Sequence, residues 1–184
     1  MSLVSRVDHD GAALPPDILA LYETERQRAG RVTNMKAILL HSPAAFQVFG
    51  QWLSVKAEVR EVIGDRALSI YSHAISAVAG CLLCSTYFRR LLLAEGLTPE
   101  NFTPTPDEAL LIELGHAVGD PQQAPNPDLM PRVVARYGQK ATVDLMTYGG
   151  TMLATNVFNN LLGIDLDDYL EPFRLSPARA GAGA

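Results

Sequence analysis

Residues 65–94 read DRALSIYSHAISAVAGCLLCSTYFRRLLLA, and this stretch decides the fold of the chain. Apolar side chains recur every three or four residues from Leu68 to Val78, which is the spacing of an amphipathic helix. Gly80 then predicts a bend or break, and residues 81–94 resume a helical pattern. The stretch therefore predicts two consecutive helices, with a pair of cysteines directly after the break between them.

The same spacing of apolar side chains runs through most of the remaining chain. It predicts further helices over residues 15–30, 34–41, 42–59, 105–119 and 140–162, the last interrupted at Gly149-Gly150. Thr105-Pro106-Asp107-Glu108 is a capping box with proline at the first helical position, which marks a helix start. Since no segment shows the alternating pattern and tight turns of a hairpin, we expect an all-α, single-domain helical bundle.

The composition is that of an ordinary folded protein. The chain has 184 residues, of which 48% are hydrophobic and 19% charged, enough for one domain with a sizeable core. A net charge of -5 and the lack of a run of basic residues argue against nucleic acid and anionic membranes as partners. The longest apolar run, residues 77–84, is far below the ~20 residues that cross a bilayer. No apolar leader segment follows Met1, so we expect a soluble, cytoplasmic protein.

Both ends of the chain have compositions that predict mobility. Residues 1–13 are polar and lack a helical pattern, and residues 176–184 read SPARAGAGA. The predicted organisation is therefore a mobile N-terminal segment at 1–13, one helical domain at 14–175 and a flexible tail at 176–184.

The only two cysteines, Cys81 and Cys84, lie three residues apart. Positions i and i+3 share a helix face, so the two sulfurs can form a disulfide or share a proton with little backbone movement. The CxxC spacing favours a lowered thiol pKa, and a lone pair of cysteines fits a reducing compartment. A reactive dithiol is the functional hypothesis, and its alternative is two buried cysteines that pack as small apolar residues. Two cysteines do not supply a four-ligand zinc site, so we predict no metal and no other cofactor.

A working dithiol needs a group that removes the thiol proton or stabilises the thiolate. If Cys81 opens a helix, the helix N-terminus stabilises a thiolate there by about 1 kcal/mol. Tyr87, one turn after Cys84, can donate a hydrogen bond to a thiolate, although a helix tyrosine is also a common half-buried core residue.

Other polar residues near the pair are less favoured as groups that act on the thiol proton. His73 lies eight residues before the first cysteine, ~12 Å along one continuous helix, so it can act as a base only if the chain folds back at Gly80. Its alternative is a core or interface histidine. Arg89 and Arg90 are expected to point to solvent or to pair with Glu95.

Three segments of the chain resemble the carboxymuconolactone decarboxylase superfamily and, within it, the AhpD-like alkylhydroperoxidase branch. Residues 30–43, GRVTNMKAILLHSP, are similar to the opening motif of the family. Residues 65–84 with Gly96-Leu97 resemble its core helix pair, and residues 143–165 its closing helix and acidic turn. The resemblance implies an AhpD-like helical bundle that forms homo-oligomers. It also implies that the two cysteines reduce a hydroperoxide and are re-reduced by a dithiol carrier.

The sequence departs from the family motif at two positions. The motif has glutamate twelve residues before the first cysteine and histidine four residues after the second, where this chain has Ser69 and Phe88. Phe88 can only pack. The two missing residues form the family's proton relay, and loss of a general base typically costs about a hundredfold in rate. His73, Tyr87 and Ser69 are therefore the candidates for an auxiliary role.

The favoured function is that of a thiol-dependent peroxidase or related dithiol oxidoreductase acting on a hydroperoxide or another small molecule. Two alternatives stay open. One is a redox-responsive or structural helical oligomer without turnover, and the other is a protein that binds or decarboxylates a lactone-like or aromatic acid, as the decarboxylase branch does. The aromatic residues Phe46, Phe49 and Trp52 suit a core or an oligomer interface, and we expect a core.

Overall fold

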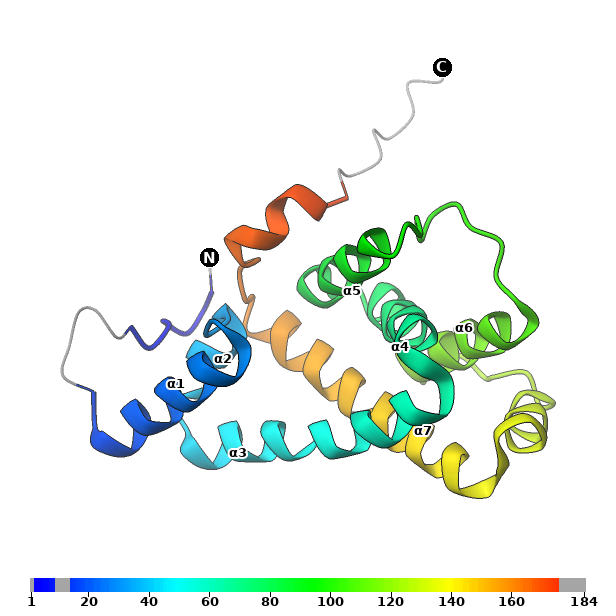
Figure 1. Cartoon of the computed structure of the whole chain (residues 1–184), viewed down its shortest axis with the longest axis horizontal. Helices are drawn as coiled ribbons and strands as arrows, with labels where there is room; N and C mark the ends of the chain where they lie inside the picture. The colour runs from blue at the N-terminus through cyan, green and yellow to red at the C-terminus, as the bar shows by residue number, and fades with distance from the viewer. Residues whose placement is uncertain (1, 9–13, 176–184) are drawn as a thin grey trace, which may run out of the picture.

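The computed structural model describes residues 2–8 and 14–175, and it confirms the all-α fold class for them (Figure 1). None of these residues is in a strand, and none of their helices has both the length and the apolar content that crossing a lipid bilayer requires. In chain order the elements are α1 (Pro16–Ala29), α2 (Asn34–Leu39), α3 (Pro43–Gln51), α4 (Leu53–Val78), α5 (Leu82–Ala94), α6 (Pro106–Gly119), α7 (Leu129–Leu161) and the 3-10 helix η1 (Asp168–Phe173).

Two predicted helix starts carry the caps that their sequences indicate. Ser42 begins α3, with its hydroxyl accepting the Ala45 N–H at 3.3 Å. At α6 the capping box is reciprocal: Thr105 Oγ1 accepts the Glu108 N–H at 3.2 Å, and the Glu108 carboxylate accepts the Thr105 N–H at 2.9 Å. The same carboxylate pairs with Arg66 of α4 at 2.6 Å, so the cap also joins α6 to α4.

Helix α7 bends at a different glycine from the one that the sequence pattern indicates. The predicted interruption at Gly149-Gly150 is wrong, because α7 runs through both residues and its kink lies at Gly138, with φ 80° and ψ 172°. A residue with a β-carbon rarely adopts such a φ, so glycine suits the kink. Gly149 has a packing role instead: a β-carbon there would collide with the hydroxyl of buried Tyr71 on α4. Apolar spacing does not separate a glycine that bends a helix from one that permits close packing.

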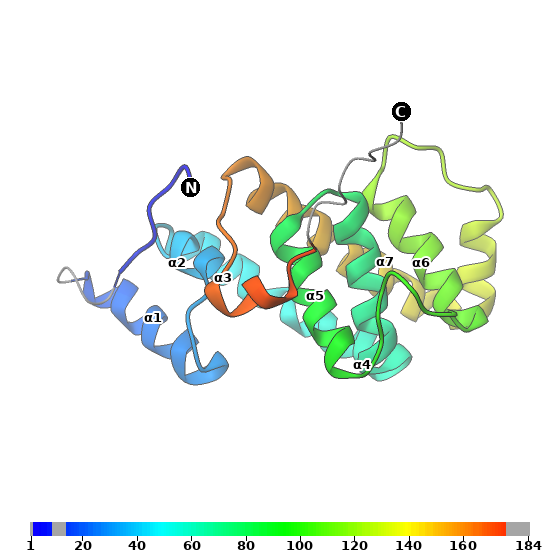
Figure 2. The same cartoon turned by 90° about the horizontal axis from the view of Figure 1, so that it is seen from above.

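Helices α4, α6 and α7 enclose the main core, and α5 packs on α4 (Figures 1 and 2). Tyr71, Ile75, Leu111 and Leu145 are almost completely buried at its centre. The Tyr71 hydroxyl donates to the Leu145 carbonyl at 3.1 Å, which satisfies the polar end of this buried ring. This core fixes α4, which ends at the turn with the cysteines, and α7, which packs on α4.

A smaller apolar cluster joins α1, α2 and α3 to the C-terminal part of α7. Phe46 is buried in it, as expected, and Phe49 packs against Phe158 of α7 with ring centroids 5.3 Å apart. The ring centroids of Trp52 and Phe49 are 4.7 Å apart, and Trp52 is half-buried. The N-terminal helices therefore lie beside α7, on the side of the molecule away from α6 (Figure 1).

Residues 2–8 are bound to the helical domain. The Leu3 N–H donates to the Leu162 carbonyl at 2.9 Å, and the Val7 N–H donates to the Ala37 carbonyl at 3.1 Å. This part of the predicted mobile segment 1–13 is thus held at the end of α7 and on α2. Residues 1 and 9–13 and the predicted tail at 176–184 lie outside the described residues.

Candidate active site

The two cysteines lie at the turn between α4 and α5, where the sequence predicts a break. Gly80 takes a φ of +65°, and Cys81 is the N-cap residue of α5. The Cys81 N–H donates to the Ser76 carbonyl at 3.0 Å, and Cys81 Sγ accepts the Cys84 N–H at 3.4 Å. The sulfur of Cys81 therefore takes the place of a serine or threonine hydroxyl in a helix cap, at the positive end of the α5 dipole.

Asn159 of α7 faces both sulfurs. Its side-chain N–H group donates to Cys84 Sγ at 3.1 Å and lies 3.9 Å from Cys81 Sγ. The other end of the amide, Asn159 Oδ1, is buried and has no hydrogen-bond partner among the described residues. Cys81 and Cys84 are only 1% and 4% exposed. The site is thus a buried dithiol with a directed amide donor.

The two thiols have opposite pKa shifts. A hydrogen bond from the Cys84 side chain lowers the pKa of Cys81 against the opposing effect of burial, and hydrogen bonds from the Cys84 N–H and Asn159 lower it further. The pKa of Cys84 is raised well above its ordinary value by its hydrogen bond to Cys81 and by burial. The first proton of the pair is therefore lost mainly from Cys81, and Cys84 holds the second more tightly.

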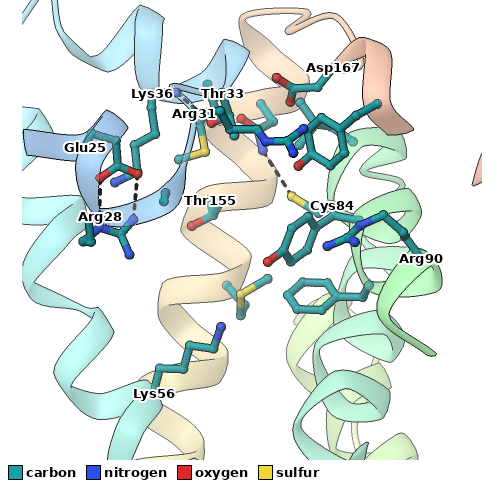
Figure 3. A pocket seen from close by; sticks show the side chains of 18 residues that line it. Glu25, Arg28, Arg31, Thr33, Lys36, Lys56, Cys84, Arg90, Thr155 and Asp167 are labelled. Carbon is teal, nitrogen blue, oxygen red and sulfur yellow. Dashed lines mark hydrogen bonds and ion pairs between the residues drawn. The ribbon is translucent and has the colours of Figure 1, made fainter. Parts of the chain in front are cut away.

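A cavity of about 540 Å³ opens on the Cys84 side of the pair (Figure 3). Its walls come from α1, α2, α4, α5, α7 and the residues around η1. Cys84 and Asn159 line the cavity, and Cys81 does not. The volume lies within the range of small-molecule sites, so a ligand that enters the cavity meets Cys84 first.

The cavity has more basic than acidic side chains. Glu25 binds Arg28 through both carboxylate oxygens, at 2.6 and 3.1 Å. Burial raises the pKa of Asp167, whose Oδ1 accepts the Asn34 N–H at 2.8 Å. The charged lining residues are the basic Arg28, Arg31, Lys36, Lys56 and Arg90 and the acidic Glu25 and Asp167.

Tyr87 is the predicted auxiliary residue that lies at the cavity. It packs edge-on against Phe88, with ring centroids 5.1 Å apart, and both side chains line the wall. Among the described residues, no hydrogen bond joins the Tyr87 hydroxyl to either sulfur. Phe88 packs, as its side chain requires.

The other two predicted auxiliary residues, His73 and Ser69, lie on α4 and do not line the cavity. His73 is half-buried, and burial lowers its pKa. The charge of Glu100 raises this pKa, and the charge of Arg89 lowers it. Ser69 is 6% exposed. The chain does fold back at Gly80, but the structure does not bring His73 or Ser69 to the cavity, and their catalytic role stays a prediction.

The expectation for the two arginines of α5 is wrong. Arg89 pairs with Glu100 at 2.8 Å and not with Glu95. The guanidinium of Arg90 lies 5.7 Å from the ring centre of Tyr169 at the cavity wall, and its Nε is buried without a partner among the described residues. The physical reason is that η1 packs on α5 and covers the face that the helix pattern assigns to solvent.

Sequence reasoning missed Asn159. The only signal in the sequence is the group of polar residues, Asn156, Asn159 and Asn160, inside the apolar segment 140–162. The Ser76 hydroxyl donates a hydrogen bond to Asn156 Oδ1 at 3.3 Å. The side chains of both buried asparagines thus form hydrogen bonds with residues at or near the cysteine turn, 75 or more residues away in sequence.

Comparisons with known proteins agree with this fold. No family model matches the sequence, and the comparison with curated proteins finds no match either. Among solved structures, the chain is similar to the alkylhydroperoxidase AhpD core from Ralstonia eutropha JMP134, described as an uncharacterized peroxidase-related protein. The two chains are 18% identical with a TM-score of 0.61, over 89% of this chain and 93% of that one. At this identity the likeness shows the fold alone, and the chain has the all-α fold of the AhpD core.

Proposed function

We propose that the protein reduces hydroperoxides with the Cys81–Cys84 dithiol. The observation that carries the proposal is the joint placement of the pair at a helix N-terminus, beside an amide donor, with one sulfur at the wall of a cavity. A structural cysteine pair needs neither the donor nor the cavity. The peroxidase-related fold neighbour supports the same class of chemistry.

In the first step, a hydroperoxide in the cavity meets Cys84. The proton of Cys84 moves to Cys81 along the hydrogen bond between the two side chains, and the Cys84 thiolate attacks the terminal peroxide oxygen. The O–O bond breaks, the alkoxide takes a proton from water and leaves as an alcohol, and Cys84 becomes a sulfenic acid. The two-electron reduction of the peroxide is matched by the two-electron oxidation of this sulfur.

In the second step, Cys81 resolves the sulfenic acid. Its thiol gives its proton to the hydroxide left by the first step, and the thiolate attacks Cys84 Sγ and forms the disulfide. The hydroxide that leaves Cys84 becomes water with the proton that the reduced pair released when it ionised. The site favours a thiolate at Cys81 because the N-cap position, the Cys84 N–H and Asn159 all stabilise it. An external dithiol then reduces the disulfide to the starting pair. The overall change is one hydroperoxide and one dithiol converted to one alcohol, one water and one disulfide.

The test is hydroperoxide consumption with dithiothreitol as reductant, for wild type, Cys81→Ser and Cys84→Ser. We expect turnover in wild type, no reaction of Cys84→Ser, and a single sulfenic acid in Cys81→Ser that dimedone traps. Wild-type consumption no faster than a protein-free control would rule out the peroxidase function. Equal activity in all three proteins would show that the cysteines are structural.

A further inference from the structure

The chain has three lysines, and two of them line the cavity beside Cys84. The third, Lys140, is 75% exposed and pairs with Glu58 at 2.7 Å. Among the described residues, no ion pair joins Lys36 or Lys56 to a carboxylate, and the Lys36 ammonium lies 4.8 Å from the ring centre of Phe46. Two cations without carboxylate partners therefore share a cavity with the sulfur.

Both cavity lysines are partly withdrawn from water, and burial lowers the pKa of each. The acidic neighbours that act on them are already engaged. Glu25, whose charge acts on Lys36, gives both oxygens to Arg28, and Asp65, whose charge acts on Lys56, is in an ion pair of its own. A partly desolvated cation without a counterion is unfavourable, and a bound anion offsets that cost.

The charge of the cavity is opposite in sign to that of the whole chain. Five basic and two acidic side chains give the lining an excess of three positive charges, while the chain carries -5. A concave surface lined by one sign of charge concentrates ligands of the other sign. The charge of the lining therefore favours anionic over cationic ligands.

The remaining wall is suited to an organic ligand and not to an inorganic ion. It includes the apolar side chains of Met35, Phe88 and Met152. In Figure 3, Lys56 points into the cavity from α4, and Cys84 lies on a different side of the cavity, on α5. A ligand that contacts both Lys56 and Cys84 has a charged end, an apolar body and a second end that reaches the sulfur.

We infer that the cavity binds a small organic carboxylate, with the charged end at Lys56 and the apolar body along Met35 and Met152. Resting on the proposed function, this inference assigns the substrate class as hydroperoxides that carry a carboxylate. The peroxide end then reaches Cys84 and is reduced to an alcohol, while the cysteine pair is oxidised to the disulfide and the carboxylate is unchanged.

The first arm of the test measures binding without chemistry. Hexanoate is titrated calorimetrically into the full chain, with neutral hexanol as the control ligand. Lys56→Met removes the charge at similar side-chain length, and we expect hexanoate to bind about tenfold to a hundredfold more weakly. Lys56→Arg should restore binding, and Lys140→Met, which removes the exposed lysine, should leave it unchanged. Hexanoate affinity that does not respond to Lys56→Met, or that falls equally in Lys140→Met, would overturn the inference.

The second arm compares reduction of 6-hydroperoxyhexanoate with that of hexyl hydroperoxide. We expect kcat/KM to favour the carboxylate by about tenfold or more in wild type, and the preference to disappear in Lys56→Met. Equal reduction of both compounds by both proteins would leave the peroxidase function standing and overturn the substrate class. If neither compound is reduced while hexanoate binds through Lys56, the proposed function fails and the carboxylate site is supported.

Discussion

Replacing Asn159 with leucine tests the central contact of the site. The change removes the N–H group that Cys84 Sγ accepts at 3.1 Å and keeps a side chain of similar size. Because the site is buried and leucine fills it, water has little room to replace the lost donor. The substitution therefore isolates the effect of the amide on the ionised pair.

The expected magnitude follows from where the charge of the pair lies. It lies mainly on Cys81, which the Asn159 amide nitrogen reaches at 3.9 Å, whereas the 3.1 Å contact is to the protonated Cys84. The lost stabilisation is therefore at most the lower end of the range for hydrogen bonds to charged groups, about 1.5 kcal/mol. At about 1.4 kcal/mol per pKa unit, the first pKa of the cysteine pair rises by up to about 1 unit. At a pH below this pKa the thiolate fraction falls by up to about tenfold. The nucleophilicity of the remaining thiolate rises about threefold per unit, so the net loss of reactivity is up to about threefold.

The assay is the pH dependence of thiolate ultraviolet absorbance, with alkylation by iodoacetamide at neutral pH as a second readout. Asn160→Leu is the matched control, because Asn160 is the next residue on α7 and donates to the Ala79 carbonyl at 2.9 Å and not to a sulfur. An Asn159→Leu titration curve that coincides with that of wild type, in a folded protein, would refute the role of the amide. A shift of equal size in Asn160→Leu would show a general effect of α7.

Two further predictions concern stability and the role of His73. Gly149→Ala should lower the free energy of unfolding by about 1–3 kcal/mol, because the new β-carbon meets the Tyr71 hydroxyl and Tyr71 is fully buried. Gly150→Ala, with open space around it, should be neutral or stabilising by up to about 1 kcal/mol, and equal denaturation midpoints for the two variants would contradict this packing. His73→Gln should leave the thiol titration unchanged, since His73 does not line the cavity. Burial lowers the pKa of His73, so protonation favours the unfolded chain, and wild-type stability should fall as pH drops below about 6.5. Denaturation across this range should show a weaker fall in His73→Gln, and a shifted thiol titration would instead support His73 as a base.

Local sequence signals predicted most of the fold. Ser42, Gly80 and the capping box at Thr105 act within one turn of themselves, and the structure has each helix boundary where these residues indicate it. The predicted helix interruption at Gly149 is wrong because glycine is needed there for packing. The side chain that packs against it, Tyr71, lies on another helix and 78 residues away in sequence. A pattern along one helix carries no information about such a contact.

The sequence by itself determined the all-α class, the helix break at Gly80 and the placement of two cysteines one helical turn apart. Each of these depends on residues close together in the chain. Only the tertiary structure decided what surrounds Cys84. Asn159 is contributed by α7, and the two lysines of the cavity are contributed by α2 and α4. Packing of the long helices α4 and α7 brings these groups together, and no local spacing encodes the direction in which they point. The environment that determines whether the dithiol is reactive is therefore a property of helix packing.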